Sequence, residues 1–242
     1  MLAVPDGKTL PGWRDYERAV ALAFGGEAQE SKFIFDVLLL DPKRPGVQLG
    51  LSCKMRRELH RLEKQGRATI ELSNSAGKFW DHLRTKGIDQ SNYRHHPAIV
   101  GAALIELVRQ WHSEVSLEHG GSVDLTGSSY LTLSWSNSGW YQLHQFSLDF
   151  PDPDRLFWHF PAVKKQGTET PARHLRAEDD TGTLFEWYGE SGGQLKYYPP
   201  VQQAIWSSER FRLQPLAAGE HGLLSKVAAY FPELWRAANE LA

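Results

Sequence analysis

Hydrophobic and polar residues recur with two different periods along the chain, and these periods predict helices and strands. In residues 12–24 the apolar side chains return every three or four positions, as they do on one face of a helix, and a glycine pair follows. Residues 32–41 are short, apolar and partly β-branched, which is typical of a buried strand, and residues 47–55 have the same character. Residues 43–46 (KRPG) supply a turn between them, so we expect the two strands to form a hairpin.

The rest of the chain continues this mixture and then becomes rich in strands. We predict further helices at residues 56–65, 76–87, 97–112 and 223–241, the last kinked or divided at Pro232, and a short strand at residues 68–73. After residue 120, short aromatic segments alternate with Gly, Pro, Ser and Asp, a pattern that predicts strands. The pattern predicts an α/β region over residues 1–118 and a mostly β region over residues 119–242. These are either two domains or one sheet with an extension.

Composition narrows the class of protein. The 242 residues can bury a sizeable core, and 41% apolar with 23% charged residues is ordinary for a globular protein. A net charge of −2 excludes the strong basic excess of a nucleic-acid coat protein but allows local basic patches. Cys53 stands alone, so neither a disulfide framework nor a Cys-rich zinc site is expected, and the N-terminus lacks a signal-peptide pattern. We therefore expect a cytoplasmic protein. We also expect no membrane span, because the longest apolar stretch is too short.

Nine tryptophans are more than a chain of this length usually carries. They are expected mainly in the core and between packed elements. Their flat, amphipathic rings also suit contact with a partner or with stacked bases.

Candidate chemistry centres on the predicted hairpin. Asp36 lies inside the apolar segment FIFDVLLL, where a carboxylate is costly unless it is paired or binds a metal. Ser52 and Lys54 are two positions apart in the second strand, so they share a face that the hairpin can bring beside Asp36. Hydrolysis of a phosphodiester needs a hard cation held by carboxylates, an activated water and a cationic side chain. These three residues are of the required types.

The arrangement resembles the PD-(D/E)xK nuclease superfamily, which includes many type II restriction endonucleases. Glu17 on the first helix, Asp36 on the first strand and Lys54 on the second strand follow that family's order, over residues 12–55. The resemblance implies a mixed central sheet flanked by helices, as in restriction endonucleases, and Mg²⁺-dependent cleavage of double-stranded DNA by a homodimer. It also implies that Asp36 binds the metal with support from Glu17, and that Lys54 orients the attacking water.

Ser52 departs from the family pattern, in which Asp or Glu is commonest at that position. In one restriction-enzyme branch of the family Ser-x-Lys is the rule, and the missing carboxylate comes from a Glu further along, on the following helix. In this sequence the candidates for that carboxylate are Glu58, Glu63 and Glu71. Alternatively Glu17 alone completes the site, or activity has been lost. In the last case the protein is an inactive nuclease fold or a β-rich module that binds nucleic acid or protein.

Basic residues in three segments are candidates for contact with DNA. They are Arg56, Arg57, Arg61 and Lys64 after the second strand, Lys78 in the helix that follows residues 73–75, and Arg173 and Arg176 in the polar segment 164–180. We expect segment 164–180 to be a surface loop. We expect Ser75 to cap the helix at residues 76–87, unless the backbone amides there bind a phosphate instead.

Overall fold

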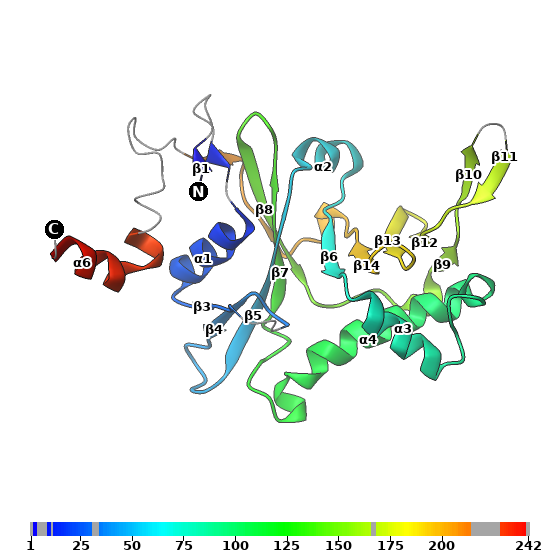
Figure 1. Cartoon of the computed structure of the whole chain (residues 1–242), viewed down its shortest axis with the longest axis horizontal. Coiled ribbons are helices and arrows are strands. Elements are labelled where there is room, and N and C mark those ends of the chain that lie inside the picture. The colour runs from blue at the N-terminus through cyan, green and yellow to red at the C-terminus, as the bar shows by residue number, and fades with distance from the viewer. Residues whose placement is uncertain are drawn as a thin grey trace.

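In the part of the chain that the structure describes, two large β-sheets and the helices packed against them form most of the fold (Figure 1). The structure, a computed structural model, describes residues 2–3, 9–10, 12–30, 34–165, 168–213 and 228–240. Within these ranges the chain is mixed α/β, in agreement with the class predicted from the periodicity. No helix among the described residues is long and apolar enough to cross a membrane.

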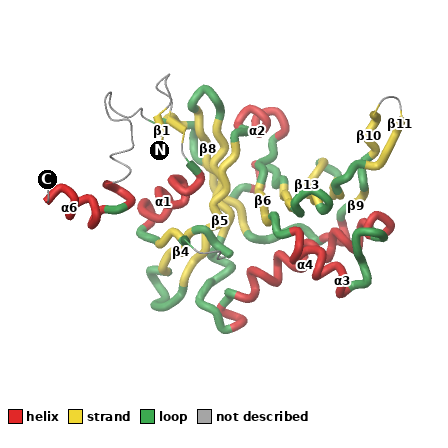
Figure 2. The backbone as a smooth tube through the Cα atoms, viewed as in Figure 1, coloured by secondary structure: helices red, strands yellow, loops and turns green. Residues whose placement is uncertain are grey.

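The helices lie mostly in the first half of the chain (Figure 2). They are α1 (Trp13–Phe24), α2 (Leu59–Gln65), α3 (Ala76–Thr85), α4 (Pro97–Glu114) and α6 (Pro232–Glu240). Short 3₁₀ turns are η1 (Tyr93–His95), η2 (Leu117–His119), η3 (Pro153–Arg155) and η4 (Val201–Gln203).

The larger sheet is mixed. Its strand order is β15 (Trp206–Ser207), β8 (Trp140–Ser147), β7 (Ser129–Trp135), β5 (Gln48–Arg56), β4 (Val37–Leu40) and β3 (Glu27–Ala28), and β16 (Phe211–Arg212) also pairs with β8. The expected hairpin is present, because β4 and β5 pair antiparallel with Val37 opposite Leu51. By contrast β5 and β7 are parallel, and parallel neighbours need a long crossover. That crossover contains α2, β6, α3 and α4.

The second sheet is antiparallel throughout. Its order is β6 (Ile70–Ser73), β14 (Gln194–Tyr197), β13 (Gly182–Tyr188), β12 (Leu175–Asp179) and β9 (Phe157–His159). Two small ribbons, β1 (Leu2–Ala3) with β2 (Thr9–Leu10) and β10 (Ala162–Lys165) with β11 (Thr168–Pro171), lie apart from it. The pairs β5–β7 and β6–β14 both cross residue 118, so the segments 1–118 and 119–242 share both sheets. This pairing favours the one-domain alternative.

The apolar face predicted for residues 12–24 is buried only in part, because Tyr16 and Val20 are buried whereas Trp13 and Phe24 are 58% and 65% exposed. Tyr16, Val20 and Ala21 on α1 pack against β4, β5, β7 and β8 on one face of the larger sheet. The largest cluster lies between α3, α4 and the second sheet, where the fully buried Trp187 contacts the rings of Phe79 and Trp80. Trp80, Trp158 and Trp187 are therefore core residues, whereas Trp13, Trp140 and Trp206 are exposed.

Four local predictions need correction. Asp36 lies in a bend just before β4 rather than inside a strand. Its side chain accepts the hydrogen bond of the Cys53 amide, which would go to a backbone carbonyl if the strand continued. The helix expected from residue 56 begins at Leu59, since β5 runs on to Arg56. Segment 164–180 is not a loop: its described residues form most of β10, β11 and β12, because they pair along their backbones.

The side chain of Ser75 does not cap α3, since its hydroxyl makes no capping bond and its amide instead donates to the hydroxyl of Ser73 at 3.1 Å. Near the C-terminus, a helical turn at residues 228–230 and α6 are separated at Phe231, next to the predicted break at Pro232. Residues 223–227 and 241 of that prediction lie outside the described residues.

Gly101 in α4 lets Trp158 of β9 pack directly on the helix backbone. A Cβ at position 101 would overlap the indole ring of Trp158, which is 4% exposed. We expect Gly101→Ala to lower the free energy of unfolding by about 1–3 kcal/mol, because overpacking displaces a buried ring. Urea denaturation of the full chain measures this change.

Gly77 in α3 provides the matched control. Its added Cβ would meet nothing within 4 Å, so Gly77→Ala should raise the free energy of unfolding by about 0.4–1 kcal/mol. Equal stability of Gly101→Ala and the wild type would show that Trp158 does not sit on α4 as described.

His112 of α4 is buried between the rings of Phe35 and Tyr130, at centroid distances of 5.6 and 6.1 Å. Burial, together with the positive charge of Lys54, lowers the pKa of His112 to about 4. The unfolded chain therefore takes up this proton near pH 6.5, before the folded chain does. As the pH falls from about 6.5 to about 4, the free energy of unfolding should drop, by up to about 3 kcal/mol from this residue.

The variant His112→Phe keeps a ring but cannot titrate, so its pH profile should lack this component. Urea titrations of both proteins between pH 4 and 7 measure the difference, and the exposed His60→Ala serves as the control. Parallel profiles for wild type and His112→Phe would contradict the assignment.

Candidate functional site

The carboxylate of Asp36 is the centre of the site. Its position is set by Phe35 and Val37, whose side chains are fully buried on either side of it. One oxygen, Oδ2, accepts the backbone amide of Cys53 at 2.7 Å and the Lys54 ammonium at 2.8 Å. The Ser52 hydroxyl donates to the same atom at 3.3 Å. Three consecutive residues of β5 thus converge on Asp36.

The alternation of β5 selects which side chains reach this carboxylate. Ser52 and Lys54 share the face toward Asp36, as predicted from their spacing. The Cys53 side chain belongs to the core beneath α1, where burial raises the pKa of its thiol. Cys53 therefore contributes a backbone amide to the site and no reactive sulfur.

Glu17 enters the site from α1. It is 5% exposed, and the Arg14 guanidinium lies 3.3 Å from its Oε2. Burial raises the pKa of Glu17, and the negative charge of nearby Asp36 raises it further. Two carboxylates that repel each other across a partly buried space form a place where a cation is favoured.

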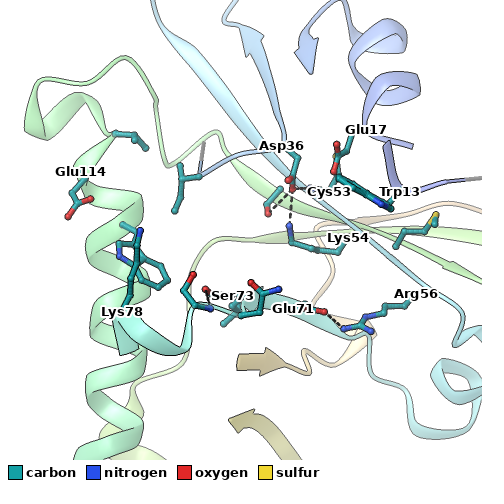
Figure 3. A pocket seen from close by; sticks show the side chains of 18 residues that line it. Trp13, Glu17, Asp36, Cys53, Lys54, Arg56, Glu71, Ser73, Lys78 and Glu114 are labelled. Carbon is teal, nitrogen blue, oxygen red and sulfur yellow. Dashed lines mark hydrogen bonds and ion pairs between the residues drawn. The ribbon is translucent and has the colours of Figure 1, made fainter. Parts of the chain in front are cut away.

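These residues open into a cavity of about 890 Å³ (Figure 3). One wall comes from α1, Asp36 and β5, and the other from β6, α3 and the end of α4. Figure 3 shows Lys54 extended toward Asp36, Glu17 on the same side, and Lys78 with Glu114 on the other. The carboxylates of the lining are Glu17, Asp36, Glu71 and Glu114, and its cations are Lys54, Arg56 and Lys78.

The three further glutamates proposed for the missing carboxylate are placed differently. Glu71 of β6 lines the cavity but forms an ion pair with Arg56. Glu58 accepts the backbone amide and the hydroxyl of Thr69, at 3.0 and 2.7 Å, and does not line the cavity. Glu63 is paired with Arg210 at 2.5 Å. The cavity therefore offers Glu17 and Glu71 as partners for Asp36.

Only some of the residues proposed to contact DNA reach this cavity. Arg56 and Lys78 line it. The other five, which are Arg57, Arg61, Lys64, Arg173 and Arg176, are not part of its lining. The guanidinium of Arg176 is held by the carboxylates of Glu186 and Glu178, so its donors are already engaged.

The lining residues that were not singled out from the sequence include Trp13, Trp111 and Glu114. In the sequence, Trp13 is one of the apolar positions of the first helix. Trp111 and Glu114 lie near the end of α4. Sequence patterns do not place Trp111 and Glu114 near Asp36, since α4 reaches the cavity only through the crossover between β5 and β7.

The donor set bears on which cation could bind. Among the described residues no group of three or more His, Cys, Asp and Glu side chains is close enough to hold a metal ion together. Mg²⁺ does not need such a group, because it is usually bound by one or two carboxylates and keeps several waters. Asp36 with Glu17 matches that requirement, whereas a structural zinc site would need more ligands.

We compared the chain with known families, proteins and structures. No protein-family model, no curated protein and no solved structure matches it. The function is therefore inferred from the geometry of Asp36, Lys54 and their neighbours.

Proposed function

We propose that the protein is a Mg²⁺-dependent endonuclease that hydrolyses phosphodiester bonds of double-stranded DNA, related in its site to the PD-(D/E)xK enzymes with a Ser-x-Lys variant. The observation that carries this proposal is the convergence of Ser52, the Cys53 amide and Lys54 on one oxygen of Asp36. A carboxylate that can bind a metal ion, next to a lysine that faces the same cavity, provides the side chains that metal-assisted hydrolysis requires.

Asp36 and Glu17 are the residues that would hold the cation. Burial and, after it, the charge of Asp36 raise the pKa of Glu17, and a positive ion beside both carboxylates would offset both effects. When bound, Mg²⁺ supplies Lewis-acid polarisation of the phosphate and lowers the pKa of a water. Glu71 is the second choice as partner of Asp36, because it comes from β6 in the opposite wall of the cavity, whereas Glu17 is in the same wall as Asp36.

Lys54 positions the attacking water and stabilises charge on the phosphate. Its ammonium carries three donors, and Asp36 takes one of them at 2.8 Å. The side chain is 23% exposed and lines the cavity, so its remaining donors can reach a water or a phosphate oxygen. The Asp36 carboxylate fixes the ammonium at that place before substrate arrives.

Several finer expectations belong to the same proposal. A mixed sheet whose catalytic hairpin lies beside a helix bearing Glu17 agrees with a restriction-endonuclease-like arrangement. Arg56 and Lys78 would contact phosphates at the cavity. Cutting both strands of a symmetric target needs two sites, so we expect a homodimer acting on DNA in the cytoplasm.

The first test is cleavage of supercoiled plasmid with Mg²⁺. We expect nicking or linearisation by the wild type, its loss with a chelator, and a loss of roughly 100-fold or more in rate for Lys54→Ala and for Asp36→Asn, because each removes a positioned charge. Gel electrophoresis of time courses measures the rates.

Lys86→Ala is the matched control, since Lys86 also forms an ion pair, with Glu106 at 2.7 Å, but outside the cavity lining. Cleavage that survives both Lys54→Ala and Asp36→Asn would refute the site. Absence of cleavage by the wild type on plasmid, linear and methylated DNA would favour a non-catalytic binding module.

A second test decides which glutamate partners Asp36. Glu17→Gln should weaken Mg²⁺ binding about 10-fold or more, because it removes one of two carboxylates that share the ion, whereas Glu71→Gln should change it much less. Isothermal titration calorimetry of Mg²⁺ with the full chain measures both affinities. The opposite order would assign the second carboxylate to Glu71.

A further inference from the structure

Trp13 is an exposed aromatic residue in the wall of the proposed catalytic cavity. It is 58% exposed, although Tyr16 and Glu17, about one turn further along α1, are buried. It belongs to none of the hydrophobic clusters formed by the described residues. A tryptophan left in solvent forgoes the large gain of burying its ring, so its place in a polar cavity calls for a ligand that covers it.

The ring of Trp13 is covered on one side by the neighbouring residue of the chain. The Arg14 guanidinium lies over it, 4.3 Å from the ring centroid. Arg14 is fixed in turn by Glu17 at 3.3 Å and by the backbone carbonyl of Gln29 at 3.1 Å. With one face under Arg14, the exposed area is mostly the other face and the edges. Such a ring is a preorganised platform for a flat, uncharged partner.

The dimensions and walls of the cavity indicate what that partner is. A volume of about 890 Å³ lies in the range of cavities that hold one ligand of drug size, which is comparable to one or two nucleotides. On the α4 side, Trp111 also lines the cavity, with the Lys78 ammonium 5.5 Å from its ring centroid. Aromatic faces beside cations are the surfaces that bind single nucleic-acid strands.

We infer that DNA enters this cavity as an unpaired strand, with the base of one nucleotide stacked on Trp13 while its phosphate lies at Lys54 and Asp36. This inference rests on the proposed function for its catalytic residues, and it changes the substrate from fully paired duplex to DNA with unpaired nucleotides at the cut, such as locally melted duplexes or single strands. Trp13 is then a substrate-positioning residue that touches the base and not the reacting phosphate.

The test compares three fluorescein-labelled 20-nucleotide probes of one sequence: a single strand, the matched duplex, and a duplex with a central mismatched bubble. Binding is measured by anisotropy in the Lys54→Ala background, which keeps the DNA intact. Trp13→Ala should weaken binding of the single strand and the bubble by roughly 5- to 150-fold, the change that corresponds to losing about 1–3 kcal/mol of stacking. Binding of the matched duplex should be almost unchanged.

Two variants separate stacking from structure. Trp13→Phe keeps an aromatic face and should restore most of the affinity. Trp140→Ala removes another exposed tryptophan, also covered by an arginine (Arg212 at 4.4 Å) but outside the cavity lining, and should bind all three probes as the parent does. Equal losses on all three probes, or equal losses for Trp13→Ala and Trp140→Ala, would overturn the inference.

The same proteins with Lys54 intact distinguish this inference from the proposed function. If the matched duplex is cut in a Lys54-dependent manner, and Trp13→Ala cuts it as fast as the wild type, the endonuclease proposal stands and the stacking inference fails. If the wild type neither binds any probe nor cuts it with Mg²⁺, both fail. Preferential cutting of the single strand and the bubble, lost in Trp13→Ala and regained in Trp13→Phe, supports the inference.

Discussion

An ionised carboxylate placed between two fully buried side chains has to find donors, and Asp36 finds them on a single neighbouring strand. The Cys53 amide and the Lys54 ammonium both bond to its Oδ2 atom. Hydrogen bonds to a charged group contribute about 1.5–3 kcal/mol each, so this arrangement favours one register of β4 against β5. A slip by one residue would turn Ser52 and Lys54 to the opposite face and bring the Cys53 side chain to the carboxylate. The same interaction therefore sets the register of the hairpin and assembles the candidate site.

The second wall of the cavity depends on a different constraint, the parallel pairing of β5 with β7. Because the chain has to cross over between parallel neighbours, α3, α4 and β6 are carried to the side on which Lys54 emerges. β6 then joins the second sheet by pairing with β14, which brings Glu71 opposite Lys196 and near Arg56. The residues that line the cavity lie between Trp13 and Val115, and β7 and β14 of the second half of the chain position its walls by pairing with β5 and β6.

Charge within the cavity is closely balanced. Asp36 is paired with Lys54, Glu17 with Arg14 and Glu71 with Arg56. These cations pair with the three carboxylates, and the pKa of Glu17 is raised first by burial and further by the charge of Asp36. In the proposed function, a divalent cation would bind beside Asp36 and Glu17. Trp13, held under Arg14, would then place a base next to the same carboxylates.

The sequence by itself determined the elements whose signals are local: the helix that bears Glu17, the hairpin with its KRPG turn, and the shared face of Ser52 and Lys54. Periodicity and turn residues are signals within a few neighbouring positions, so the sequence was enough to predict that Asp36 and Lys54 lie close together. Only the tertiary structure decided that Glu58 bonds to Thr69 while Glu71 lines the cavity, that segment 164–180 forms strands, and that Trp13, Trp111 and Glu114 line one cavity. These placements depend on strand pairing and helix packing between residues far apart in the chain, for which local periodicity carries no signal.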